Sequence, residues 1–171
     1  MTDYVALLRG VNVGGVTIKM VDLAEVVRGL GYTNVKTVLA SGNVLFTTPD
    51  AASAAKNVLE AALRGRFGYE AWVHVLTVDA IREIIAAYPY PRSAERHAYV
   101  VFAVKPEVRT ELLAVKLDAA LEQAEAGDGV IYWSVPKGST LDSAMGKAQA
   151  KASYKPWITT RNLNTLERLG G

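Results

Sequence analysis

Hydrophobic residues in the first half of the chain form either continuous runs, typical of buried strands, or a three-to-four-residue spacing, typical of amphipathic helices. The runs predict strands over 4–8, 35–40, 44–48 and 71–78, and the helical spacing predicts helices over 20–30 and 51–63. Gly31 follows the first helix, where a left-handed C-cap belongs. On the second helix, Val58 and Leu59 are expected on the buried face.

This order of elements, βαββαβ, is that of the ferredoxin-like split arrangement and defines an α+β fold class. Right-handed crossovers, with the first and third strands central, bring the C-terminal ends of the first and second strands to one edge of the sheet. The loop after Leu8 and the hairpin at 41–43 are therefore expected side by side, with Gly42 at a positive φ. The second helix should end at the same edge with Arg64 and Arg66.

The second half predicts a smaller α+β unit, ferredoxin-like or partial, so the domains are expected at 1–78 and 79–171. Asp79 is expected to cap the first helix of this half. Strands are predicted over 98–104 and 129–135, and helices over 106–127, 141–152 and 160–169. The two halves share no matching residues, so an internal repeat would have to be structural.

Composition is that of an ordinary globular protein, with 171 residues of which 50% are hydrophobic and 21% charged. Cys is absent, which excludes disulfides and thiolate chemistry. The N-terminus has no signal-peptide pattern, and the apolar run at 98–104 is far shorter than the roughly 20 residues of a membrane-spanning helix. We therefore expect a cytoplasmic protein with no membrane partner.

The glycine-rich stretch after the first strand is the strongest candidate for a binding site. Backbone N–H groups in such a turn and at a helix start favour an anion, and Arg9 adds a bidentate donor for phosphate or carboxylate. The stretch has neither a dinucleotide fingerprint nor a Walker motif. The predicted ligand-binding residues of this edge are Arg9, Asn12, Gly14, Gly15, Lys19, Ser41 and Asn43. The alternative is that the glycines only shape a tight turn and that Asn43 satisfies the hairpin.

A second polar cluster, Arg161, Asn162 and Asn164, could form the other wall of a cleft between the halves. Its alternative is a helix start capped by Thr159 or Thr160. The residues 137–171 carry six basic and two acidic residues, although the net charge of the chain is only +2. Three of the basic residues, Lys147, Lys151 and Lys155, would form one stripe on a continuous helix, either for a polyanion or as a solvated face.

Other chemistries find little support in the sequence. His74 and His97 have no partner residues at metal-ligand spacing, so no metal site is predicted. Ser41 and Ser139 lack the context of a catalytic nucleophile. The sequence identifies neither a cofactor nor catalytic residues, and it does not predict whether the protein is an enzyme.

Three motifs carry a resemblance to a known family. They are Leu-Leu-Arg-Gly-Val-Asn-Val-Gly-Gly at 7–15, Ser-Gly-Asn-Val at 41–44 and Thr-Thr-Arg-Asn-Leu-Asn-Thr at 159–165. Together they resemble the bacterial domain-of-unknown-function family 1697, which implies tandem α+β units of ferredoxin-like type. The resemblance brings no activity, cofactor or catalytic residue. Leu163 stands where the family usually has Trp, and the segment 148–158 is longer than usual.

The interpretation preferred from the sequence is a protein that binds a small anionic ligand at the loop edge of its first sheet. One alternative is a module for RNA or single-stranded nucleic acid, although the third predicted strand, 43–47, carries one aromatic where such modules alternate several. A further alternative is a protein-interaction module without a ligand. The ligand, the biological partner and the oligomeric state are not predicted.

Overall fold

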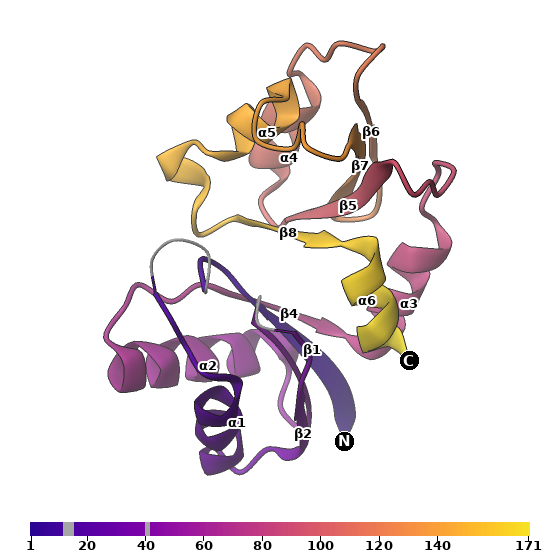
Figure 1. Cartoon of the computed structure of the whole chain (residues 1–171). Coiled ribbons are helices and arrows are strands. Elements are labelled where there is room, and N and C mark those ends of the chain that lie inside the picture. Colours follow the sequence, from indigo (N-terminus) through magenta and orange to yellow (C-terminus); the bar gives the residue numbers. More distant parts are fainter. Residues whose placement is uncertain (12–15, 40–41) are drawn as a thin grey trace. The chain divides into compact units, whose positions relative to one another are not determined.

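The computed structural model describes residues 1–11, 16–39 and 42–171 (Figure 1). Asn12, Gly14, Gly15 and Ser41, all predicted site residues, lie outside the described residues. The chain forms two compact units, Met1–Arg82 with Glu167–Gly171, and Glu83–Leu166. Each unit contains one four-stranded antiparallel sheet, so the fold is α+β as predicted.

The first unit has the predicted βαββαβ order. Its elements are β1 (Thr2–Leu8), α1 (Met20–Gly29), β2 (Thr33–Thr37), β3 (Asn43–Thr48), α2 (Ala52–Phe67) and β4 (Val73–Thr77). The strand order β2-β3-β1-β4 makes the first and third strands central. Both helices lie on one face of this sheet (Figure 1), where Leu23 and Leu59 pack against Ala6 and Phe46.

Two local predictions in this unit are wrong. Val58 is 41% exposed, and Glu60 is buried in α2 instead. Asp79 does not cap α3 (Val78–Ala86), because the Thr77 hydroxyl accepts the Ala80 N–H at 3.0 Å, and Asp79 instead pairs with Arg82. In both cases a polar side chain that finds a backbone N–H displaces the simpler sequence pattern.

The second unit repeats the βαββαβ order. It contains β5 (Arg96–Ala103), α4 (Pro106–Leu113), β6 (Gln123–Ala126), β7 (Val130–Pro136), α5 (Ala144–Gln149), a 3₁₀ turn η1 (Ala152–Tyr154) and β8 (Ile158–Asn162). The strand order β6-β7-β5-β8 corresponds to that of the first sheet. Residues of α4 and α5, such as Leu112 and Met145, pack against the sheet residues Val101 and Trp133. The helix α6 (Leu163–Gly170) follows β8.

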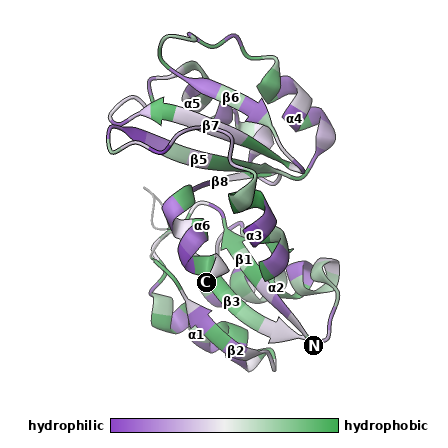
Figure 2. Cartoon of the chain, turned by 90° about the vertical axis from the view of Figure 1, so that its right-hand side faces the viewer, coloured by the Kyte–Doolittle hydropathy of each residue, from purple (hydrophilic) through white to green (hydrophobic). Residues whose placement is uncertain are grey.

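The sequence predicted too much helix in this unit. The helix predicted from 106 to 127 ends at Leu113, and Gln123–Ala126 pairs with β7 as an edge strand. The helix predicted from 160 begins at Leu163, because Ile158–Asn162 pairs with β5. Pairing with a neighbouring strand overrides the helical preference of a short segment. Figure 2 shows why periodicity misses β6, which is largely hydrophilic, whereas the C-terminal part of β1 is hydrophobic.

Candidate functional site

Backbone hydrogen bonds bring three segments of the first unit to one edge of the sheet. The Leu8 N–H donates to the Gly42 carbonyl at 2.8 Å, and the Arg9 N–H donates to the Trp72 carbonyl at 3.0 Å. The chain leaving β1 therefore lies between the β2–β3 hairpin and the start of β4. This is the juxtaposition that the βαββαβ topology predicts.

Gly42 and Asn43 fix the hairpin at this edge. Gly42 has φ +87°, and a Cβ there would lie 2.9 Å from the Leu8 Cβ, so only glycine fits without a shift. Asn43 is fully buried, and its Nδ2 donates to the Val38 carbonyl at 2.8 Å. The Asn43 amide nitrogen thus closes the hairpin, which gives this residue the structural role that was the alternative to ligand binding.

Arg9 and Trp72 adjoin through their backbones at the end of the β1–β4 ladder. Arg9 follows Leu8 and Trp72 precedes Val73, the last pair of that ladder, and the Arg9 N–H donates to the Trp72 carbonyl. Arg9 is partly buried, and desolvation lowers the pKa of its guanidinium. The indole Nε1 of Trp72 is buried and has no hydrogen-bond partner within the described part of the chain. The edge thus presents a desolvated cation and an indole donor together.

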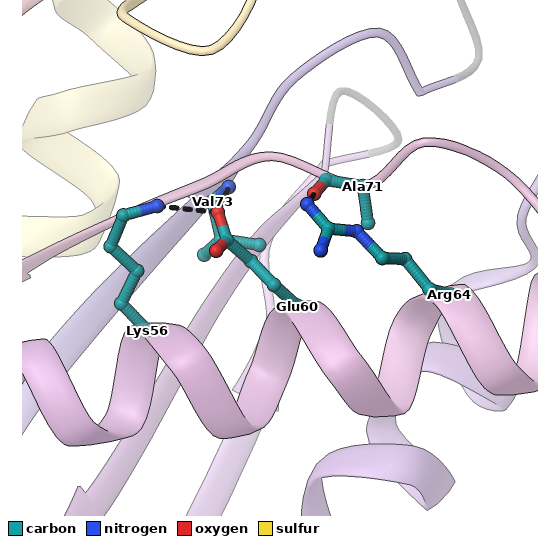
Figure 3. Close-up of polar contacts among 5 residues, drawn as sticks. All are labelled: Lys56, Glu60, Arg64, Ala71 and Val73. Carbon is teal, nitrogen blue, oxygen red and sulfur yellow. Dashed lines mark hydrogen bonds and ion pairs between the residues drawn. The ribbon is translucent and has the colours of Figure 1, made fainter.

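Arg64, at the end of α2, brings a second guanidinium to Trp72. Its Cζ lies 4.8 Å from the centroid of the Trp72 ring, and its Nη2 donates to the Ala71 carbonyl at 2.9 Å (Figure 3). Arg66, which was predicted at the same edge, lies in the last turn of α2, and its Cζ is 5.0 Å from the centroid of the Phe67 ring. Arg64 therefore contacts the ring of Trp72, a residue that was not predicted from the sequence to belong to this site.

A buried carboxylate holds the start of β4 against α2. Glu60 accepts the Val73 N–H at 2.9 Å and forms an ion pair with Lys56, one helical turn earlier (Figure 3). Since β4 is an edge strand, this side chain satisfies a backbone donor that the sheet leaves open. The only signal in the sequence was the i, i+4 spacing of Lys56 and Glu60.

Lys19 occupies the N-cap position of α1. Its carbonyl accepts the N–H groups of Asp22 and Leu23 at 3.0 and 3.1 Å, and its side chain is exposed and forms no capping bond. Asp22 already places a negative charge in the first turn, which offsets the unfavourable cation at this helix end. Because Asp22 already offsets the positive charge of Lys19, the N-terminus of α1 has less need of a bound anion.

The C-terminal cluster is built into the connection between β8 and α6. The pKa of Arg161 is lowered to about 10 by burial, and its Nη1 donates to Thr159 Oγ1 at 2.7 Å. Asn162 Oδ1 accepts the Asn164 N–H at 2.9 Å, so Asn162, rather than Thr159 or Thr160, caps α6. The Asn164 side chain bonds Arg92. These contacts all lie within the second unit.

The second sheet carries a tryptophan at the position that corresponds to Trp72. Trp157 directly precedes β8, and its carbonyl accepts the N–H of Val104, the first residue after β5, at 3.0 Å. The Lys105 Nζ lies 4.8 Å from the centroid of its ring. Each unit therefore places a tryptophan and a cation where its fourth strand begins, a match that the unaligned sequence did not reveal.

Another guanidinium lines a surface cavity in the second unit. A surface cavity of about 360 Å³ surrounds Arg96, whose Nε donates to Ser134 Oγ and whose Nη2 donates to the Leu121 carbonyl, each at 2.9 Å. These bonds give Arg96 a structural role. Within 1–11, 16–39 and 42–171, no three His, Asp or Glu side chains gather in a metal-binding group, and no helix is long and apolar enough to cross a membrane.

The architecture defines a class of protein with two α+β units, each holding a tryptophan and a cation at the start of its fourth strand. Within that class, the chain belongs to the family described as "Protein of unknown function (DUF1697)", whose model matches residues 1–132. The third resemblance motif, 159–165, lies beyond the matched residues.

A solved structure shows the same fold. It is that of the conserved bacterial protein SP0830 from Streptococcus pneumoniae, with a TM-score of 0.81 and 24% sequence identity over 99% of this chain and 97% of that protein. A comparison with curated proteins found no match.

Proposed function

We propose that the protein binds a small anionic ligand, bearing a phosphate or carboxylate group, at the edge formed by Arg9 and Trp72. The observation that supports it most is the placement of a partly buried arginine next to a tryptophan whose buried indole N–H has no partner in the described residues. The buried indole N–H of Trp72 is a hydrogen-bond donor, so the group that satisfies it must be an acceptor, and a neighbouring guanidinium favours the same kind of group.

Electrostatics favour an anionic acceptor over a neutral one. Burial disfavours the charged form of Arg9, as its lowered pKa shows, and a bound anion would offset that desolvation. A planar guanidinium also matches the geometry of carboxylate and phosphate oxygens. Arg64 adds positive charge beside the same indole.

A guanidinium binds a terminal phosphate or carboxylate through parallel hydrogen bonds, so we propose that such a group is the part of the ligand that meets Arg9. The named groups bind and orient a ligand, and binding is therefore the function they support. A cytoplasmic location, as predicted from the sequence, agrees with a metabolite ligand.

The alternative of nucleic-acid binding on the open face of the first sheet gains no support. Phe46, the aromatic residue of β3, is 1% exposed and packs with Tyr32 at a centroid distance of 5.0 Å. Bases that stack on a sheet require exposed rings. Any nucleic-acid contact would need a different surface.

The test is calorimetry and thermal-shift measurement with inorganic phosphate, nucleotides and dicarboxylates. Wild-type protein should bind at least one of these anions, and Arg9→Ala should weaken that binding by about tenfold, as expected for one charged hydrogen-bonding group. Arg28→Ala, which removes an exposed arginine of α1 in the same unit, should bind as wild type does. The proposal fails if Arg9→Ala leaves every ligand response unchanged.

A further inference from the structure

Trp157 is an exposed aromatic side chain on a firmly held backbone. It is 37% exposed, although tryptophan is usually mostly buried. Its N–H donates to the Tyr154 carbonyl at 2.8 Å, and its carbonyl accepts the Val104 N–H at 3.0 Å. Hydrogen bonds on both sides thus fix the backbone that carries the indole.

Lysine side chains lie over two aromatic rings at this end of the second sheet. The Lys105 Nζ lies 4.8 Å from the centroid of the Trp157 ring, and the Lys151 Nζ lies 5.1 Å from that of Tyr154. Lys155, two residues before Trp157, is exposed. The predicted helical stripe of lysines does not form, because α5 ends at Gln149 and the 3₁₀ turn places Lys151 over Tyr154.

The charge of this segment is one-sided. Between Asp142 and Glu167 the chain has four basic residues, Lys147, Lys151, Lys155 and Arg161, and no acidic residue. The acidic Glu111 of α4 accepts the Tyr154 hydroxyl at 2.5 Å. Lys105, Lys151 and Lys155 are exposed, so the segment around Trp157 presents basic side chains to solvent.

We propose that the surface formed by Trp157, Lys105, Lys151 and Lys155 binds single-stranded nucleic acid. A base stacks on an exposed aromatic ring regardless of its sequence, and neighbouring lysines pair with the phosphates that flank it. An acidic peptide would also meet the lysines, but it has no bases to stack on the indole. The inference concerns the second unit and does not depend on the anion site of the first.

The test is fluorescence anisotropy of labelled oligo(dT) and oligo(U) with the full chain over a range of salt concentrations. Binding should weaken as salt rises, and Trp157→Ala should weaken it by about tenfold, whereas Trp157→Phe, which keeps a ring for stacking, should retain most of it. The triple variant Lys105→Ala, Lys151→Ala, Lys155→Ala should reduce the slope of log K against log salt by about 2, because each phosphate contact with a single strand contributes about 0.7.

A matched triple variant controls for net charge. Lys36→Ala, Lys116→Ala, Lys137→Ala removes three exposed lysines from other parts of the chain and should leave most of the binding intact. Thermal unfolding would establish that all variants are folded. Undetectable binding at low salt, equal losses in the two triple variants, or tighter Trp157-dependent binding of poly-glutamate or phosphatidylserine vesicles would each overturn the proposal.

Discussion

The two sheets place a tryptophan at corresponding positions, but they surround it differently. Trp72 precedes β4 and adjoins Arg9, which is partly buried, whereas Trp157 precedes β8 and lies under Lys105, which is exposed. In both units the carbonyl of the tryptophan accepts an N–H at 3.0 Å from the residue that follows the first strand. The same backbone framework thus presents two different cations.

The connection after the first strand explains the difference. In the first unit, Gly10 takes φ +71° directly after Arg9, and α1 begins only at Met20. In the second unit, Pro106 begins α4 three residues after Ala103 ends β5, which leaves Lys105 at the surface.

The units also differ in the buried carboxylate that stabilises each. Glu122 is 1% exposed and accepts the Trp133 Nε1–H at 2.8 Å and the Ala144 N–H at 2.9 Å. Glu60 accepts the Val73 N–H and pairs with Lys56. Glu122 thus ties β7 to the start of α5, whereas Glu60 ties an edge strand to the middle of α2.

The largest expected effect is that of Glu122→Ala. Because this change leaves three donors, the Trp133 indole N–H and the Ala144 and Met145 N–H groups, without their acceptor, it should lower the free energy of unfolding by about 3 kcal/mol. Urea denaturation measures the loss. Glu125→Ala, an exposed neighbour, should change it by less than about 0.5 kcal/mol, and equal losses would contradict the assigned role of Glu122.

Glu60→Ala should have the next largest effect and lower the free energy of unfolding by about 2 kcal/mol. The loss is smaller because Glu60 accepts a single backbone N–H, and the ammonium group of Lys56 can be hydrated by water in the variant. The matched control is Glu70→Ala, which removes an exposed carboxylate of the same unit. If Glu60→Ala cost more than Glu122→Ala in the same urea series, the ranking of the two carboxylates would be wrong.

Gly42→Ala tests the packing of the hairpin against β1. Gly42 and Gly138 both have a positive φ, but a Cβ meets the Leu8 side chain at 2.9 Å only at Gly42, while Gly138 has nothing within 4 Å. Backbone strain should therefore lower the free energy of unfolding of both alanine variants by about 1 kcal/mol. The clash with Leu8 should lower that of Gly42→Ala by about 1 kcal/mol more. Thermal unfolding that ranks them equally would show that the hairpin is not held against Leu8.

Tyr69→Phe should change the free energy of unfolding least, and this change should depend on pH. Burial raises the pKa of Tyr69 from 10.0 to about 12, so its stabilising contribution is complete below pH 10 and is lost as the pH rises toward 12. Its buried hydroxyl has no hydrogen-bond partner in the part of the chain that the structure describes, so Tyr69→Phe should be neutral or stabilise by about 0.5 kcal/mol. Unfolding measured at pH 8 and pH 11 should show a smaller difference in the variant; an unchanged difference would contradict the raised pKa.

The sequence predicted the first unit well because its strands are apolar runs and its helices carry regular stripes. It failed where partners far along the chain decide the structure. The segment Gln123–Ala126 is a strand only because β7 offers it an edge, and Ile158–Asn162 because β5 does. Periodicity contains no information about either neighbour.

The candidate site was predictable only in part. Arg9 stood out because a glycine-rich turn follows an apolar run, and the topology correctly brought it beside the hairpin. Trp72 and Trp157 were not recognised as a pair, because their correspondence depends on strand order rather than on any shared sequence motif. The roles of Asn12, Gly14, Gly15 and Ser41 remain predictions from the sequence.

If the two tryptophan edges bind different anions, the indole N–H signals in a ¹H–¹⁵N correlation spectrum will show it most directly. The chain has three tryptophans, and Trp133, whose Nε1–H is bonded to Glu122, serves as an internal control. Inorganic phosphate should shift the Trp72 signal alone, and oligo(dT) should shift that of Trp157. A Trp72 signal unmoved by any small anion, or equal shifts of Trp72 and Trp157 with both ligands, would contradict the account.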